Sequence, residues 1–139
     1  MEPYVHTVQY YETDRMGITH HSNYIRWMEE ARVVLLSKIG WPLEKLEEIG
    51  LGIPTVSVDC KYKQTTTFAD RVAVTAKLVK WGGVRMTLAY EMRKEDGALA
   101  CTASSEHCFL DREGRIVRHQ RDYPDFYQAF IGLLQEQDT

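Results

Sequence analysis

Cysteine is scarce in this chain of 139 residues, and its spacing excludes the common sites that cysteine builds. The three cysteines are Cys60, Cys101 and Cys108. Their odd number argues against a disulfide framework, and no two of them have the CxxC spacing of a structural zinc site. We therefore expect free thiols, most of them buried.

Long apolar runs and an excess of basic charge are also missing. No stretch approaches the roughly 20 apolar residues of a membrane-spanning helix, and the N-terminus lacks the basic and apolar regions of a signal peptide. A net charge of -3 and a pI near 5.9 create no field that attracts a nucleic acid. We expect a cytoplasmic protein with no membrane span and no nucleic-acid partner.

The composition that remains is typical of a folded globular protein, because 44% of the residues are hydrophobic and 27% are charged. The chain contains no internal repeat, low-complexity tract or linker. Its length suits one domain with a real core and leaves little room for a second. A single domain over residues 1–139 is the prediction.

Apolar periodicity predicts three helices. Apolar residues recur at three- and four-residue steps over residues 24–39, with Ser22 or Asn23 as a suitable N-cap. A short helix over residues 43–49 and a C-terminal amphipathic helix over residues 123–135 show the same spacing. The last of these is expected to cover either the core or a subunit boundary.

Alternation of apolar and polar residues predicts the strands. Residues 5–12 are rich in β-branched and aromatic side chains and are predicted to form the first strand. Residues 53–117 alternate almost throughout, and Gly82–Gly83 and Asp96–Gly97 suit hairpin turns between strands. The order of elements predicts an α+β fold in which one long helix lies on a curved antiparallel sheet.

The densest cluster of unusual residues joins the first strand to the long helix. Residues 10–24 read Tyr-Tyr-Glu-Thr-Asp-Arg-Met-Gly-Ile-Thr-His-His-Ser-Asn-Tyr. This segment closely resembles the signature of hotdog-fold thioesterases of the 4-hydroxybenzoyl-CoA thioesterase type, in which Thr-Asp, a later Gly and an Asn-Tyr pair recur. The residues that match are Asp14, Gly17, Asn23 and Tyr24.

The resemblance covers most of the chain, including Ala31–Arg32 in the long helix and Phe68–Asp70 before a later strand. It implies a hotdog fold, in which a curved antiparallel sheet wraps a long central helix. It also implies hydrolysis of an acyl-CoA thioester. Two departures, at residues 65–67 and 118–119, lie away from the proposed chemistry and near regions that shape subunit contacts or the acyl pocket.

The resemblance implies that Asp14 is the catalytic carboxylate, acting either as the nucleophile or as a general base on water. A thiol with a pKa near 8.5 is a good leaving group, so a carboxylate without a strong acid beside it can suffice. The oxyanion site falls at the helix N-terminus, with the backbone of His21 as donor and Gly17 letting the chain approach the thioester. The His21 side chain is either catalytic or a packing residue.

Other interpretations of these residues remain open. An aspartate in a loop most often caps a turn, and adjacent histidines such as His20 and His21 do not easily share one ion, so we expect no metal and no cofactor. A protein of this fold that binds acyl-CoA or acyl carrier protein without turnover is the main alternative. A hydratase ranks last, because no helix motif pairs a histidine with an acid.

The substrate-binding residues are predicted from position. The acyl group is expected along Tyr24, Trp27 and Met28, although the last two suit a core equally well. Basic residues are needed for the CoA phosphates, and we select Lys63 and Arg85 among the strand cations. Because the fold exposes a long strand edge, we expect a homodimer that assembles further into a homotetramer.

Overall fold

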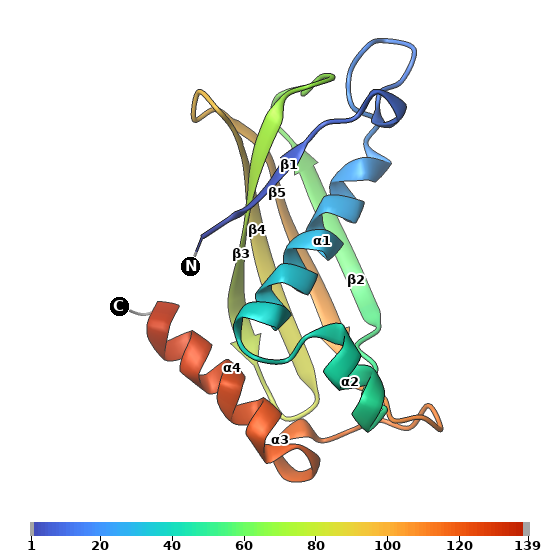
Figure 1. Ribbon diagram of the computed structural model, residues 1–139, viewed down its shortest axis with the longest axis vertical. Coiled ribbons are helices and arrows are strands. Elements are labelled where there is room, and N and C mark those ends of the chain that lie inside the picture. Colours follow the sequence, from blue (N-terminus) through green and yellow to red (C-terminus); the bar gives the residue numbers. More distant parts are fainter. Residues whose placement is uncertain (1, 138–139) are drawn as a thin grey trace.

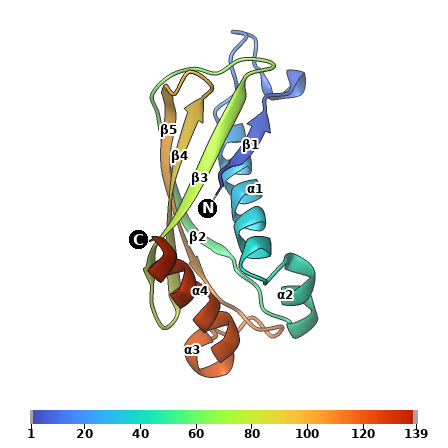
Figure 2. The same ribbon diagram turned by 60° about the vertical axis from the view of Figure 1, so that its left-hand side comes forward.

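A computed structural model describes residues 2–137 as a curved antiparallel sheet with helices on one face (Figures 1 and 2). The five strands pair in the order β1-β3-β4-β5-β2, so β1 and β2 form the two edges. The elements in chain order are β1 (Tyr4–Thr7), the 3-10 helix η1 (Tyr10–Glu12), α1 (Ser22–Lys38), α2 (Leu43–Ile49), β2 (Thr55–Tyr62), β3 (Arg71–Trp81), β4 (Arg85–Lys94), β5 (Leu99–Cys108), α3 (His119–Asp122) and α4 (Pro124–Gln137).

Helix α1 crosses the concave face of the sheet and supplies one wall of the core. Its buried apolar residues lie three or four positions apart, as one face of a helix requires: Tyr24, Trp27, Met28, Ala31 and Leu35. On the sheet, alternate residues of β3 and β4 point toward this face and are buried, for example Val74 and Leu88. The predicted long helix and strands are therefore confirmed, and the buried apolar residues form one cluster.

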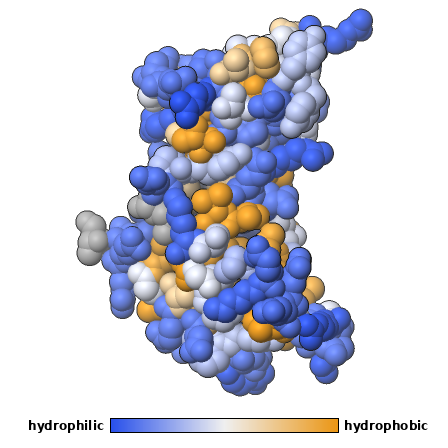
Figure 3. Space-filling model, viewed as in Figure 1, coloured by the Kyte–Doolittle hydropathy of each residue, from blue (hydrophilic) through white to orange (hydrophobic). Residues whose placement is uncertain are grey.

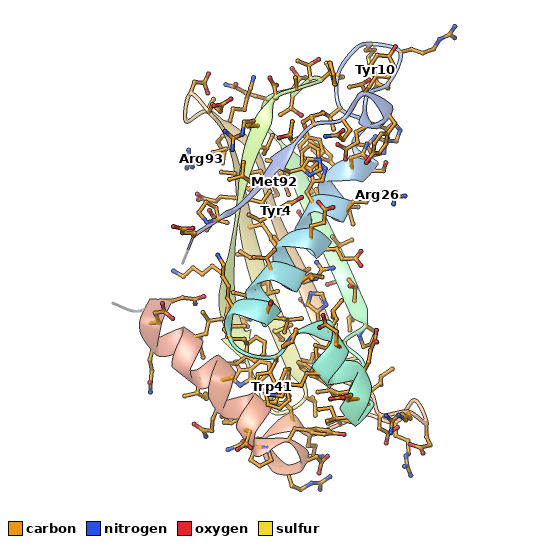
Figure 4. All side chains as sticks on the ribbon, viewed as in Figure 1. Tyr4, Tyr10, Arg26, Trp41, Met92 and Arg93 are labelled. Carbon is orange, nitrogen blue, oxygen red and sulfur yellow. The ribbon has the colours of Figure 1, made fainter. Side chains whose placement is uncertain are left out.

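Helix α4 covers the end of the concave face that α1 leaves open. Phe126 and Phe130 are buried there against Trp81, whose ring lies 4.2 Å from that of Phe130. The Gln137 side chain ties the end of α4 to β3 by accepting from the Leu78 N–H and donating to the Leu78 carbonyl. The C-terminal helix thus covers the protomer's own core, with Trp41 beside it at the same end (Figure 4).

The structure differs from the predicted elements in three places. The first strand ends at Thr7 rather than residue 12, because the chain turns into η1 and Glu12 points inward. The strand region ends at Cys108 rather than near residue 117, and a loop leads to α3, a helix too short to show an apolar periodicity. His21, not Ser22 or Asn23, occupies the N-cap position of α1.

The three cysteines are free, as predicted, with Cys101 buried and the other two half-buried. In residues 2–137 no helix has the length and hydropathy to cross a membrane. On the face drawn in Figure 3, apolar side chains reach the surface in separate patches between hydrophilic areas.

A chain of polar side chains lies buried beneath α1. The Arg32 guanidinium donates to the Tyr90 hydroxyl at 3.1 Å, and this hydroxyl bonds Ser105, which in turn bonds His107 Nε2 at 2.7 Å. Burial and the nearby Arg32 charge lower the pKa of His107 to about 4. Burial also lowers the pKa of His119, which stacks on Trp81 at the other end of the core. Both histidines are therefore neutral in the folded protein at neutral pH.

The lowered pKa values of these histidines predict that the folded protein becomes less stable as the pH falls from 7 to 5. The unfolded chain binds a proton at His107 near pH 6.5, whereas the folded chain does so only near pH 4. His107 alone should cost about 2 kcal/mol of unfolding free energy over this range. Urea denaturation at pH 7 and pH 5 measures the loss, and His107→Gln should remove about that much of it. An unchanged pH dependence in the variant would show that another group is responsible.

Candidate functional site

The segment between η1 and α1 folds into a tight loop that presents Asp14. The Asp14 N–H donates to the Ile18 carbonyl at 2.8 Å, and the Gly17 N–H donates to the Asp14 carbonyl at 2.9 Å. Gly17 has a φ of 81°, in the left-handed region that side chains disfavour, although no atom lies within 4 Å of an added Cβ. The loop therefore needs glycine for its backbone conformation, not for space.

The loop is held against the connection between β2 and β3. The Thr19 N–H donates to the Thr66 carbonyl at 2.9 Å, and the two threonine hydroxyls lie 2.6 Å apart. The Thr67 hydroxyl donates to the Gly17 carbonyl at 2.7 Å. Thr19 and Thr66 are both buried, so water competes little with these bonds and the loop position is well defined.

A pocket of about 270 Å³ opens where this loop, the first turn of α1 and the end of β2 meet. It brings together four residues that the sequence predicted for the site: Asp14, His21, Tyr24 and Lys63. Met16, Ile18 and Tyr62 supply apolar surface in its wall. Gly17 contributes indirectly by shaping the loop. Candidate residues far apart in the sequence thus line one small cleft.

The Asp14 carboxylate is half-buried in this wall and only partly used by the fold. Its Oδ1 accepts a hydrogen bond from the Met16 N–H at 2.8 Å, which orients the side chain. Within residues 2–137, Oδ2 accepts no hydrogen bond. One carboxylate oxygen is therefore available to a ligand in the pocket.

The start of α1 offers an unused backbone donor in a residue that lines the same pocket as Asp14. The N–H groups of Asn23 and Tyr24 donate to the carbonyls of His20 and His21, and that of Ser22 approaches the His20 ring at 3.3 Å. The His21 N–H has no acceptor among the residues that the structure describes. It lies at the positive end of the helix dipole, which favours a negatively charged ligand atom.

The side chains around this donor are mostly fixed. The His21 ring is exposed, stacks on His20 at 4.2 Å between ring centroids, and makes no hydrogen bond within residues 2–137. The Tyr62 hydroxyl donates to the His21 carbonyl at 3.2 Å, and partial burial together with the neighbouring Cys60 raises the pKa of Tyr62 to about 12. Burial likewise raises the pKa of Tyr24, whose hydroxyl lies 3.0 Å from that of Thr66. Both phenols therefore stay neutral at neutral pH.

Trp27 and Met28 lie behind the pocket wall rather than in it. Both are fully buried in the protomer, where the Trp27 Nε1 donates to Glu12 at 2.8 Å and the Met28 sulfur lies 3.6 Å from that of Cys60. In the protomer they are core residues, and their contact with an acyl group stays a prediction.

Arg85 does not share the pocket within one protomer. It pairs with Cys108 of β5, whereas Tyr62 at the pocket pairs with Cys101, seven residues away on the same strand. That separation is roughly 23 Å along a strand. The Arg85 guanidinium instead lies 3.5 Å from Glu106. Lys63 is the basic residue that the structure places in the pocket wall.

Glu12 is a buried carboxylate of the same motif for which the sequence analysis predicts no role. It directly precedes Thr13–Asp14, yet it is only 4% exposed. Its oxygens accept hydrogen bonds from His6 at 2.7 Å, from the Gln9 N–H at 2.8 Å and from Trp27 at 2.8 Å. Burial by itself raises the pKa of Glu12, but these three donors outweigh burial and hold the pKa below its usual value.

The backbone of Glu12 also connects separate segments of the site. Its carbonyl accepts from the His20 N–H at 2.8 Å and from the Asn23 side-chain amide at 2.9 Å. Residue 12 therefore ties β1 and η1 to the loop that carries Asp14 and to the first turn of α1. The matching Asn23 of the sequence motif has a structural use here, as a donor to this carbonyl.

A wider hollow of about 1740 Å³ lies on the other side of the loop, between β1 and α1. Its wall includes Asp14 but also three further carboxylates, Glu12, Glu29 and Glu30. The four carboxylates outnumber the two arginines of the wall, Arg15 and Arg26, and so oppose binding of the phosphates of a nucleotide carrier. The smaller pocket, which Asp14 and His21 line with a single further basic residue, Lys63, is the better candidate for a reaction centre. In the described part of the chain, no three His, Cys, Asp or Glu side chains converge as metal ligands would.

Known proteins share both the sequence pattern and this architecture. Residues 8–131 match the family model described as the thioesterase-like superfamily. The chain belongs to the thioesterase-like superfamily. The prediction of the family is thereby confirmed at this level, and the match includes Asp14, the loop and α1.

Solved structures confirm the hotdog thioesterase fold. A DHNA-CoA thioesterase from Staphylococcus aureus is 28% identical with a TM-score of 0.92, covering 99% of this chain and 95% of that one. A hypothetical protein from Aquifex aeolicus is 34% identical with a TM-score of 0.82, over 89% and 97% of the two chains. A gentisyl-coenzyme A thioesterase is 25% identical with a TM-score of 0.77, over 81% and 91%. These likenesses support the prediction of a thioester-hydrolysing enzyme.

Proposed function

We propose that the protein hydrolyses acyl-CoA thioesters in the pocket between the Asp14 loop, α1 and β2. The observation that carries this proposal is that two residues lining one cleft each have an atom without a hydrogen-bond partner in residues 2–137: a carboxylate oxygen of Asp14 and the backbone N–H of His21. A thioester carbonyl needs both groups: one to attack it or activate water, the other to stabilise the oxyanion. The same pocket in a protein that only binds its ligand would need neither.

Two routes use this geometry. In the first, Asp14 Oδ2 attacks the carbonyl carbon, the carbon–sulfur bond breaks to release CoA as a thiolate, and water then hydrolyses the mixed anhydride. In the second, Asp14 takes a proton from a water molecule that attacks directly. In both, the carbonyl oxygen gains negative charge opposite the His21 N–H at the start of α1. A role for the His21 side chain stays a prediction.

The acyl group would enter past Tyr24 and Tyr62, and the CoA phosphates would lie outside the pocket near Lys63. The relatives named for DHNA-CoA and gentisyl-coenzyme A favour a cyclic aromatic acyl group, in keeping with the predicted 4-hydroxybenzoyl-CoA type. The Tyr62 ring lies beside His21 and suits a substrate of this kind, because an aromatic acyl group can pack against the edge or the face of the Tyr62 ring.

A release assay for free thiol tests the function. The protein is incubated with aromatic, short-chain and long-chain acyl-CoAs, and CoA release is followed with a thiol reagent. We expect turnover of at least one class, with aromatic esters fastest. Binding of acyl-CoA without release of thiol from any ester would contradict the proposal and favour the non-catalytic binding protein. Turnover of acyl carrier protein thioesters alone would change the carrier and keep the reaction.

The protein is also proposed to act as a homodimer that pairs through β2. This edge strand is exposed along almost its whole length, and Val56, Val58 and Tyr62 present apolar side chains that are 42% to 47% exposed. An unprotected apolar edge of this kind is a template for pairing with a second copy. Assembly of dimers into a homotetramer stays a prediction.

Placing a charge on this edge should separate the protomers. Val58→Lys is expected to raise the dimer dissociation constant by about tenfold or more, because a lysine on an edge strand opposes pairing. Light scattering coupled to gel filtration measures the change. Val79→Lys is the matched control, since Val79 is 49% exposed on β3, which lies three strands away from β2 in the sheet. Equal masses for both variants and the parent would contradict pairing through β2.

A further inference from the structure

A second cavity lies in the core at the end of the sheet away from Asp14. It has a volume of about 260 Å³ and opens between α1, α2 and the strand β4. Its wall is mostly apolar, and we call it the leucine pocket after the buried leucines that line it beside Phe130: Leu35, Leu36, Leu46, Leu51 and Leu88. Each of these six side chains is at most 7% exposed. The pocket therefore reaches from the surface, where Leu43, Glu29 and Glu47 are exposed, into the buried core.

A cavity of this size and lining is unusual in a folded core. Protein interiors are close-packed, and a void lined by methyl groups destabilises the fold because its lining loses contacts. Water gains little there, since apolar walls give it no hydrogen-bond partners, and dry cavities of about 150 Å³ bind benzene instead. The leucine pocket is larger and by that scale holds roughly eight to ten carbon atoms.

One cationic group stands in this apolar wall. Arg32 lies half-buried on α1, lines the pocket and donates through Nη1 to the neutral Tyr90 hydroxyl at 3.1 Å. Within residues 2–137, no carboxylate approaches its guanidinium within 4.0 Å. A guanidinium removed from bulk water normally has an anionic partner, which compensates for the lost hydration. Arg32 has donors to spare and no anion to receive them.

Two glutamates that line the pocket oppose the binding of an anion by charge repulsion. Glu29 and Glu47 also line the pocket, but both are exposed, so water and salt screen their charges. Arg32 reaches further inward, to Tyr90, which follows the pocket residue Leu88 on the same face of β4. A ligand anion bound at Arg32 therefore lies nearer to the guanidinium than to either carboxylate.

We propose that the leucine pocket binds a medium-chain carboxylic acid, with its carboxylate on Arg32 and its hydrocarbon chain among the leucines. The ligand belongs to the chemical class that thioester hydrolysis releases, so the pocket would report the level of such acids to the protein. The inference concerns binding and does not require that Asp14 is catalytic.

Calorimetric titration with octanoate and with 1-octanol tests the role of the charge. Octanoate is expected to bind the parent. Arg32→Met should raise the dissociation constant of octanoate by about tenfold and change that of 1-octanol by less than twofold. Arg26→Met is the matched control, because Arg26 sits on the same helix and points into solvent (Figure 4). Glu47→Gln should tighten octanoate slightly. No binding of octanoate, or equal losses in the Arg32 and Arg26 variants, would overturn the proposal.

Methionine methyl signals locate the ligand without any substitution. Met86 lines the leucine pocket and Met16 lines the Asp14 pocket, so ¹³C-methyl labelling gives one probe in each. Octanoate should shift the Met86 signal and leave that of Met16 in place; the reverse pattern would assign octanoate to the Asp14 pocket and overturn the proposal. A protein inert toward every acyl-CoA that still shows the Met86 shift would refute the proposed function and retain this inference.

Discussion

Asp14→Asn is expected to lower thioester hydrolysis by about a hundredfold or more, the size of effect seen when a nucleophile or general base is removed. Asparagine keeps the shape of the side chain and can still accept from the Met16 N–H, so the loop should retain its conformation. What is lost is the negative charge of the carboxylate, whose Oδ2 accepts no hydrogen bond within residues 2–137. The fall should appear in kcat, measured by thiol release, with KM changed far less.

The chain offers a closely matched control for this substitution. The Asp96 Oδ1 accepts from the Ala98 N–H at 2.9 Å, the same turn geometry that Asp14 makes with Met16, but at the hairpin between β4 and β5. Asp96→Asn should keep full activity. If Asp14→Asn also keeps full activity, Asp14 is only a turn residue and the proposed chemistry fails.

Glu12→Gln is expected to destabilise the fold by about 3 kcal/mol. The carboxylate receives three donors from three segments, and an amide has only one oxygen with which to accept them. At least one buried N–H then loses its partner, and the amide NH₂ faces another donor. Urea denaturation at pH 7 measures the loss as a shift of the midpoint without a change of slope.

Glu30→Gln separates the effect of burial from that of charge. Glu30 also approaches His6, at 3.3 Å, and accepts from the Tyr4 hydroxyl, but its side chain is half exposed. Water can replace these contacts, so the expected loss is below about 1 kcal/mol. Equal losses of unfolding free energy in the Glu12 and Glu30 variants would mean that burial of Glu12 does not explain its contribution to stability.

The fold and the loop that carries Asp14 were predictable because the sequence patterns that indicate them are local. The 3.6-residue spacing around Trp27 and the alternation around Leu88 each report which side of an element is buried. The motif that carries Asp14 and Asn23 is contiguous, so the loop and the first turn of α1 could be located by sequence alone.

The features that escaped prediction depend on where separate segments meet. Tyr10 and Tyr11 favour strand, but the inward turn of Glu12 requires a 3-10 helix instead. Arg85 has a suitable charge on a suitable strand, yet pairing with Cys108 puts it at the opposite end of the sheet. The leucine pocket joins side chains from three helices, a strand and the loop after α2, and no periodicity encodes an unfilled volume.

The hydrogen bonds that hold the Asp14 loop also set when the site forms during folding. Thr19 reaches Thr66 across 47 residues, and Gly17 reaches Thr67 across 50. Contacts so distant in sequence form only after the intervening chain has closed into its loop, whereas helix α1 is a local structure that forms early. A refolding chain would therefore regain helical signal first and its arranged carboxylate last, and recovery of activity would report completion of the native topology.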